Sequence, residues 1–375
     1  MPWETKDIMS LREEFIHLAT QEGANRRELC RRFGISPQTA YKWLRRFHTH
    51  GLAGLIDQSR RPLHSPTLTS EALQSEIVQL RQRHPAWGGR KISRRLDDLG
   101  LGAVAPSTVS KVLHRHGLIE VGVEYRQAWQ RFEHELPNAL WQADFKGHFE
   151  TLSGRCMPLT VIDDHSRFNL VLHACDNARA ETVRDCLETA FRRYGLPVRM
   201  NFDNGAPWGC PNQPGQVTSL ELWLVRLGIR ISHSRPYHPQ TNGKDERFHR
   251  TLKAEVLNGR SFNSLNQVQT AFDDWRGVYN HEGPHEAIAL DTPISRYRPS
   301  PRAFPSRLPE IEYGPDDEVV TVKWNGELRY NGKRFKVSSA LHRHEVAIRP
   351  RHDEDGVYDV FYAHHHCETI RFAQT

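Results

Sequence analysis

Apolar residues in the first 56 positions recur at helical intervals and are interrupted twice. Ser10 and Asn25 each precede a glutamate by three residues, which is the spacing of a capping box at the start of a helix. Ser36 and Pro37 supply an N-cap and a first-turn proline for a further helix. The pattern therefore predicts three short helices, the first beginning near residue 10, with a tight turn before the last.

The third predicted helix has one apolar face and one basic face. In a helix-turn-helix such a basic face enters the major groove of DNA, where glutamine can read adenine and arginine can read guanine. A three-helix bundle with a solvated basic face would show the same pattern. The residues expected to contact DNA are Gln38, Thr39, Lys42, Arg45 and Arg46.

A second helix-turn-helix or winged-helix-like unit is predicted over residues 70–120, after a basic linker at 57–69. In the linker we expect DNA contacts from Arg60 and Arg61. Two helical patterns flank a Trp-Gly-Gly break, and Pro106 opens a third helix that Gly117 ends. The outward residues of this helix are expected to contact DNA and are Ser110, Lys111, His114 and Arg115. Together with the unit at 1–56, it could cover a long DNA site.

From residue 140 the apolar pattern becomes strand-like. Leu140–Phe145 is typical of a buried strand, but it carries one carboxylate, Asp144. Val198–Phe202 predicts a further strand that ends at Asp203. Sheet proteins usually place their chemistry at this carboxyl edge, so both acids are candidate site residues.

A helix is predicted from Gly243 to about Val256, with Glu246 in its first turn and Arg250 and Lys253 on the same face. A plain salt-bridged helix would show this spacing too. Three acids in one site would nevertheless suit Mg²⁺ or Mn²⁺, which take few protein ligands and leave room for phosphate oxygens.

Charge is distributed unevenly along the chain. Lys and Arg exceed Asp and Glu by 21 to 15 in residues 1–136, whereas residues 137–375 balance at 30 to 30. This asymmetry is typical of a polyanion-binding arm on a neutral body, although the excess is modest. No apolar run reaches the length of a membrane span, so we expect a soluble, cytoplasmic protein without a membrane partner.

Other chemistries find little support in the sequence. The six cysteines form no C-x-x-C pair, so neither a zinc ribbon nor a disulfide framework is indicated. The run His364–Cys367 cannot close a tetrahedron alone, because neighbours in an extended segment point to alternating sides. The chain has no G-x-S-x-G elbow and no Walker loop, which argues against serine nucleophiles and nucleotide hydrolysis.

Three sequence blocks follow one another along the chain: W-Q-A-D at 141–144, F-D-N-G at 202–205 and P-Y-H-P-Q-T-N-G-K-D-E-R-F-H-R-T-L-K at 236–253. They resemble the three blocks of the retroviral-integrase-type catalytic core, and the resemblance covers roughly residues 135–300. With two helix-turn-helix units in front, the whole chain is similar to DDE transposases of bacterial insertion sequences.

The resemblance implies an α/β, RNase H-like core in which Asp144, Asp203 and Glu246 hold two Mg²⁺ ions, with Mn²⁺ as a substitute. It implies DNA contacts near the scissile phosphate from Asn242, Arg250 and Lys253. Water would free a 3′-hydroxyl at the element's end, and that hydroxyl would attack target DNA. The implied partners are double-stranded DNA, as terminal inverted repeats and target, and further copies of the chain in a dimer or larger assembly.

Two departures from the family's pattern concern the third acid and the loop before it. Between Asp203 and Glu246 lie 42 residues, more than in many members, and the surplus is expected in the turn-rich 208–216 stretch. Insertions in surface loops cost little stability. Asp245 could be mistaken for the third acid, but it points about 100° away around the helix, and the family's spacing selects Glu246.

A small β domain is predicted over residues 316–375, after a linker with five prolines at 299–315. Asn325-Gly326 and Asn331-Gly332 are two hairpin signals in a row. The segment resembles the small β-barrel that follows the integrase core, which could bind DNA, bind a second subunit or only pack against the core.

The chain is thus expected to be multidomain: all-α helix-turn-helix units, an α/β RNase H-like core and a small β-barrel. An active transposase is the favoured function. A regulator that has lost catalysis would not need the intact triad, and an RNase H-type nuclease would leave two sequence-reading units unexplained.

Overall fold

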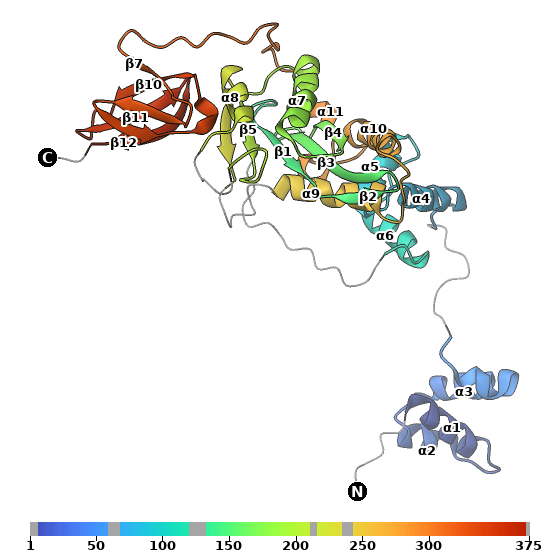
Figure 1. Ribbon diagram of the computed structural model, residues 1–375. Coiled ribbons are helices and arrows are strands. Elements are labelled where there is room, and N and C mark those ends of the chain that lie inside the picture. Colours follow the sequence, from blue (N-terminus) through green and yellow to red (C-terminus); the bar gives the residue numbers. More distant parts are fainter. Residues whose placement is uncertain (1–6, 59–67, 120–132, 211–215, 235–242, 373–375) are drawn as a thin grey trace. The chain divides into compact units, whose positions relative to one another are not determined.

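The computed structural model describes residues 7–58, 68–119, 133–210, 216–234 and 243–372 (Figure 1). The chain divides into two compact units, Met1–Thr69 and Ser70–Thr375. Three residues predicted to contact DNA, Arg60, Arg61 and Asn242, lie outside the described residues. Among the described helices, none has the length and apolar character needed to cross a membrane.

The first unit is a three-helix bundle: its elements are α1 (Ile8–Ala19), α2 (Arg26–Arg32), α3 (Pro37–His50) and a 3₁₀ turn, η1 (Gly51–Leu55). The predicted caps are confirmed, since the side chains of Asn25 and Ser36 accept backbone N–H groups of α2 and α3. The predicted cap at Ser10 is wrong. Asp7 caps α1 instead, because its carboxylate accepts from both Met9 N and Ser10 N.

The second unit begins with three more helices, which are α4 (Glu71–Arg83), α5 (Gly89–Asp98) and α6 (Pro106–Arg115). Their apolar faces form one buried cluster around Ile77, Trp87, Ile92 and Leu113. The helices confirm the pattern predicted from the sequence, because the Trp-Gly-Gly segment turns the chain between α4 and α5.

The start of α5 lies so close to α6 that only glycine fits. A Cβ on Gly89 would lie 2.3 Å from the Ser110 hydroxyl and 2.7 Å from the Pro106 carbonyl oxygen, whereas one on Gly88 would meet nothing within 4 Å. We expect Gly89→Ala to lower the free energy of unfolding by about 1–3 kcal/mol through overpacking. Chemical denaturation should show this loss, and Gly88→Ala should unfold close to wild type; equal losses in both would contradict the close approach.

The core sheet contains six strands: the first four pair antiparallel, and the last two extend the sheet in parallel. Its elements are β1 (Trp141–Phe145), β2 (Phe149–Thr151), β3 (Gly154–Asp163), β4 (Asn169–Cys175), β5 (Arg199–Phe202) and β6 (Arg230–His233). The strand order is β2-β3-β1-β5-β6, with β4 paired to β3. β1 lies at the centre, antiparallel to β3 and parallel to β5.

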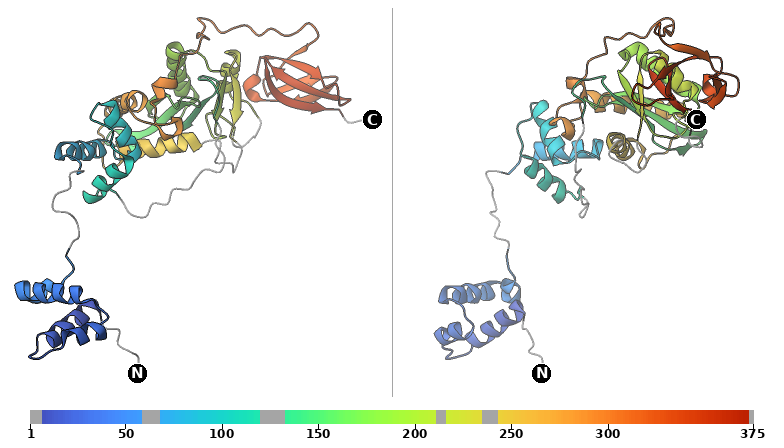
Figure 2. Two further views of the ribbon diagram at one scale, coloured as in Figure 1. Left: turned by 180° about the vertical axis from the view of Figure 1, so that it is seen from behind. Right: turned by 90° about the vertical axis from the view of Figure 1, so that its left-hand side faces the viewer.

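Helices cover both faces of this sheet, which gives the predicted RNase H-like α/β core (Figures 1 and 2). One face packs against α7 (Ala180–Tyr194) and α8 (Ser219–Arg226). The other packs against α9 (Gly243–Leu252), the π-helical turn η3 (Lys253–Leu257) and α10 (Leu265–His281). Alternate residues of a strand point to opposite faces, so Ala143 faces α7 while Asp144 faces α9.

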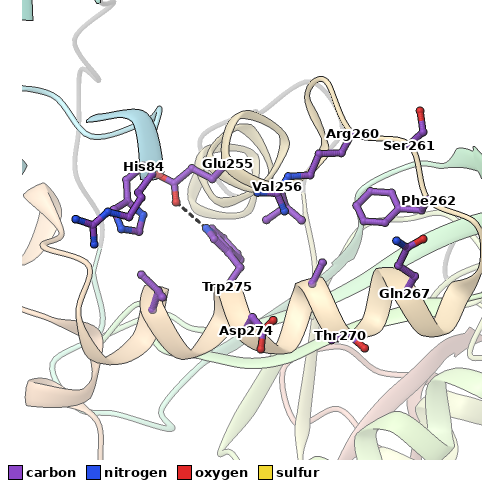
Figure 3. Close-up of a pocket in the computed structure, with 13 residues that line it drawn as sticks. His84, Glu255, Val256, Arg260, Ser261, Phe262, Gln267, Thr270, Asp274 and Trp275 are labelled. Carbon is purple, nitrogen blue, oxygen red and sulfur yellow. Dashed lines mark hydrogen bonds between the residues drawn. The ribbon is translucent and has the colours of Figure 1, made fainter. Parts of the chain in front are cut away.

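The α4–α6 helices meet the core at α10 and η3. Arg95 pairs with Glu282, and Arg94 lies 3.5 Å from Asp291. A pocket of about 670 Å³ opens beside this contact, between the end of α4 and α10 (Figure 3). In its wall Trp275 donates a 2.6 Å hydrogen bond to the Glu255 carboxylate. The three predicted acids lie elsewhere, so this pocket is separate from the predicted site.

The C-terminal segment follows η4 (Glu286–Ile288) and α11 (Pro293–Arg296) and forms a small β domain, as predicted. Its elements are β7 (Glu318–Thr321), β8 (Glu327–Tyr330), β9 (Lys333–Lys336), η5 (Ser339–Leu341), β10 (Glu345–Pro350), β11 (Val357–Tyr362) and β12 (His365–Arg371). Within the described part of the chain, the strands pair as a four-stranded sheet, β12-β11-β10-β7, and a separate hairpin, β8-β9. Closure into a barrel therefore stays a prediction. The domain packs on α8 through Leu222 and Val225.

Candidate active site

Two of the predicted acids lie side by side at the carboxyl edge of the sheet. The parallel register of β1 and β5 pairs Trp141 with Met200 and Gln142 with Asn201. Continued by two residues, this register brings Asp144 next to Asp203, which directly follows β5. Asp203 is held by its own turn, because its Oδ1 accepts from Gly205 N at 3.1 Å.

The third predicted acid, Glu246, lies in the first turn of α9 on the face of the sheet to which Asp144 points. Its neighbour Asp245 is only 1% exposed, and its Oδ1 has no hydrogen-bond partner in the described residues. Glu246 is exposed, as are Arg250 and Lys253 on the same side of the helix. The two adjacent acids thus have opposite environments: Asp245 is buried and Glu246 is accessible to a ligand.

The acids act on one another electrostatically. Burial, followed by the negative charges of Asp203 and Glu246, raises the pKa of Asp144 to about 7. Burial and the charge of Asp144 also raise the pKa of Asp245 well above its ordinary range. The cluster therefore carries mutually repelling carboxylates that a bound cation would stabilise.

One supporting contact was not predicted: His249 of α9 reaches back to the strand beside Asp144. The Thr160 hydroxyl donates to the Asp144 carbonyl at 3.0 Å, so it accepts a 2.8 Å hydrogen bond from His249 Nε2. Burial, with a smaller effect of Lys146, lowers the pKa of His249 to about 4. Its Nδ1, 4.0 Å from the Asp144 carboxylate, is therefore unprotonated, and the two groups form no ion pair at neutral pH. In the sequence, this contact is indicated by the position of His249, which is three residues after Glu246 and therefore on the same face of the helix.

A second unpredicted contact supports Asp203. His233, at the end of β6, hydrogen-bonds through Nδ1 to the Asp203 carbonyl at 2.9 Å and through Nε2 to Glu221 at 2.7 Å. Glu221 is buried in the capping box that begins α8. The Glu221 hydrogen bond is the main cause that raises the pKa of His233. The start of α8 thereby fixes the turn that carries Asp203.

Cations lie next to the acids. Lys146 directly follows β1, and its pKa is lowered first by burial and then by the charge of Lys253. The two lysines are therefore close enough to repel one another. Lys253 was predicted from the sequence as a DNA-contacting residue, whereas Lys146 was not. A phosphate group between them would relieve the repulsion.

The predicted DNA-contacting residues of the helix-turn-helix units differ in exposure. In α3, Gln38 and Arg45 are exposed, whereas Thr39 is half-buried and shares a 2.9 Å hydrogen bond with the Ser36 hydroxyl. Lys42 and Arg46 lie over the ring of Trp43, 4.6 and 5.1 Å from its centroid.

In α6, Lys111, His114 and Arg115 are exposed. Ser110 is half-buried, donates to the Pro106 carbonyl at 2.9 Å and faces Gly89. Its hydroxyl therefore serves the packing of α5 against α6.

The donor set fits a divalent cation that prefers oxygen. Asp144, Asp203 and Glu246 would supply carboxylate oxygens from a strand, a turn and a helix, and Glu246 is open to solvent. Hard cations such as Mg²⁺ bind through a few carboxylates and keep remaining positions for water and phosphate. The raised pKa of Asp144 is the signature of a carboxylate group without a neutralising charge.

This electrostatic strain predicts a pH-dependent stability of the metal-free protein. Asp144 binds its proton more tightly in the folded state, with a pKa of about 7, than at its ordinary value of 3.8. The free energy of unfolding should therefore fall as pH rises from about 4 to about 7, by up to about 1.4 kcal/mol per pH unit. Urea unfolding across this range should show a shallower slope for Asp144→Asn and for wild type in saturating Mg²⁺. Identical slopes in all three would contradict the assignment.

Models of known protein families match most of the chain, each over one segment. A helix-turn-helix domain matches residues 11–62 and a homeodomain-like domain residues 39–113. Integrase core domains match residues 134–239 and 227–293. The C-terminal domain of the IS481 family transposase matches residues 317–374.

Known proteins with similar sequences include products of bacterial insertion sequences. The insertion element IS476 uncharacterized 39.2 kDa protein of Xanthomonas euvesicatoria is 28% identical over 279 residues, 69% of this chain and 77% of that protein. The transposase for insertion sequence element IS904 of Lactococcus lactis subsp. lactis (strain IL1403) is 24% identical over 255 residues, 62% of this chain and 96% of that one. A chain of the simian T-cell lymphotropic virus intasome, in complex with PP2A regulatory subunit B56 gamma, has a TM-score of 0.39 and 16% identity, over 79% of this chain and 96% of its own.

With its integrase core, helix-turn-helix domains and IS481-type C-terminal domain, the chain belongs to the integrase-core superfamily as a transposase of the bacterial insertion-sequence type.

Proposed function

We propose that this transposase cleaves the 3′ ends of its insertion sequence and joins them to target DNA by phosphoryl transfer at Asp144, Asp203 and Glu246. The observation that carries the proposal is the raised pKa of Asp144, which arises from burial and from the charges of the two other acids. Asp144 and Asp203 lie where the parallel strands β1 and β5 end, and Glu246 of α9 is near enough for its charge to act on Asp144. A purely structural role would not require that repulsion.

The chain's own residues hold and orient the reacting groups. Asp144 and Asp203 are fixed through the β1–β5 register, and Glu246 completes the set from α9. Lys146, Lys253 and Arg250 would bind the DNA backbone beside them, while the His249–Thr160 pair keeps the Asp144 backbone in place. When held by the three acids, Mg²⁺ or Mn²⁺ would activate the attacking oxygen and stabilise the leaving oxygen of an in-line displacement.

The protonation states of Asp144 and His249 explain why the site is expected to need a bound cation. In the metal-free state the pKa of Asp144 is raised to about 7, so Asp144 binds its proton more tightly than an ordinary carboxyl group does. Deprotonation frees both of its oxygens as ligands, so cation binding is expected to release a proton. His249, uncharged at neutral pH, cannot replace the cation as a source of positive charge.

Recognition of the element's terminal inverted repeats is assigned to α3 and α6. Arg45 is exposed on α3, so Arg45→Ala is expected to weaken binding to the repeat by about 1–3 kcal/mol. Arg31→Ala removes the same charge from α2, where Glu28 lies 3.1 Å away, and should weaken binding less. Fluorescence anisotropy at fixed salt measures both. Equal losses would indicate a non-specific charge effect.

We propose that the active form is a dimer or larger assembly on DNA, because two element ends must be joined together. The function is tested by supplying the element's ends on a donor plasmid and measuring transfer of a resistance marker to a target plasmid. Transfer should require the wild-type chain and fail with Asp203→Asn. Expression of the wild-type chain without any transfer would remove the proposal.

A further inference from the structure

A second cluster of metal-binding side chains lies on the sheet face opposite the acids. His173 and Cys175 are alternate residues of β4, so both point toward α7, which contributes Cys186. One donor atom from each of the three residues lies within 4.8 Å of the others.

This cluster and the predicted acids lie on opposite faces of the sheet. In the β3–β4 pair, His173 lies opposite Leu159, and Leu172 lies opposite Thr160. Thr160 faces α9 with Asp144, whereas Leu159 belongs to the core beneath α7. The sheet therefore stands between the thiol cluster and the acids.

We propose that His173, Cys175 and Cys186 bind a thiophilic divalent cation, Zn²⁺. Thiolate and imidazole are the ligands that zinc takes in proteins, and two thiolates neutralise its charge. The three donors come from a strand and a helix that already pack together in the main core, so binding would need only small side-chain movements.

The surroundings leave room for a fourth ligand. A cavity of about 360 Å³ is lined by His173 and Cys186, together with Asp185 and Asp273. It can admit water or bring a carboxylate to the fourth tetrahedral position. Burial lowers the pKa of His173, and the charge of nearby Asp273 partly offsets this effect. A carboxylate beside a metal-binding imidazole orients the ring and raises its basicity.

Two alternative roles explain the cluster less well. A disulfide between Cys175 and Cys186 would need no histidine, yet His173 completes the group. Ordinary core packing would account for buried Cys175 but not for an exposed imidazole converging on a half-exposed thiol. A bound cation would join β4 to α7 and should raise the thermal unfolding temperature of the full chain.

The test uses the reduced, chelator-treated full chain in excess Mg²⁺, which occupies oxygen sites. Co²⁺ is titrated as a spectroscopic probe, because a cobalt–thiolate bond gives a charge-transfer absorption that carboxylates cannot give. One equivalent should produce this band, and Zn²⁺ should displace it stoichiometrically. Cys186→Ser should abolish the band, and His173→Gln should weaken affinity at least about tenfold. Cys367→Ser, in the C-terminal domain, is the matched control and should leave the band unchanged.

A measurement on wild type alone keeps the proposal testable even if the variants fail to fold. Zn²⁺ should protect Cys186 from alkylation, read by mass mapping, while Cys210 continues to react. The proposal is overturned if wild type gives no thiolate band, if the band persists in Cys186→Ser, or if a Cys175–Cys186 disulfide forms in the presence of Zn²⁺. DNA joining is not part of the readout, so failure here would leave the transposase proposal untouched.

Discussion

Glu246→Gln is expected to slow cleavage and joining of the element's ends at least about a thousandfold. The variant keeps the size of the side chain but loses a charged metal ligand, and about 4 kcal/mol of transition-state stabilisation corresponds to that factor. Because Glu246 is exposed in the first turn of α9, folding and repeat binding should survive. Single-turnover cleavage of a labelled repeat measures the rate.

Two controls sharpen this result. Glu188→Gln on α7 makes the same chemical change in a residue paired with Arg192 at 2.6 Å, and should cleave at the wild-type rate. Asp245→Asn should also remain active, because the pKa of this buried carboxyl lies well above its ordinary range and the amide mimics its neutral form. An inactive Asp245→Asn beside an active Glu246→Gln would transfer the third position to Asp245.

Asp163→Ala is expected to destabilise the core by about 3–5 kcal/mol, a large part of the stability of a typical domain. Asp163 is fully buried at the end of β3 and accepts three hydrogen bonds: from Asn138 N at 2.7 Å, Ser166 N at 2.8 Å and the Ser166 hydroxyl at 2.6 Å. Alanine would leave all three donors buried without a partner. Urea unfolding followed by tryptophan fluorescence measures the loss.

The conservative variant separates hydrogen bonding from shape. Asp163→Asn keeps one acceptor oxygen in the same position and should lose less stability than Asp163→Ala. If alanine unfolds within about 1 kcal/mol of wild type, the hydrogen bonds around Asp163 contribute little, and the turn after β3 is held by packing instead.

Strands β1 and β5 could be predicted from the sequence because a carboxylate interrupts or directly follows each of their apolar patterns. A charged residue within or directly after a buried apolar strand needs a functional reason, and Asp144 and Asp203 both met this condition. The caps of α2 and α3 were equally local and were confirmed. Asp7 was missed because the apolar repeat that marked the helix begins after it.

The contacts that support the acids could not be predicted from the sequence. His249 meets Thr160 only because β3 pairs with β1 in a register that brings Thr160 opposite Asp144. His233 meets Glu221 only because α8 returns beside β6. Helix α8 itself was not predicted, since most of its residues are buried and an apolar run of that length shows no clear helical period.

Strand transfer in Mg²⁺ shows whether the three acids form a working site; the assay uses a labelled duplex of the terminal repeat that flanks the gene and a supercoiled target plasmid. Wild type should convert the labelled repeat into a product joined to the target through its 3′ end, and Glu246→Gln should bind the repeat without joining it. If wild type binds the repeat but neither cleaves nor joins it, the three acids do not form a working site, and the chain acts as a DNA-binding regulator.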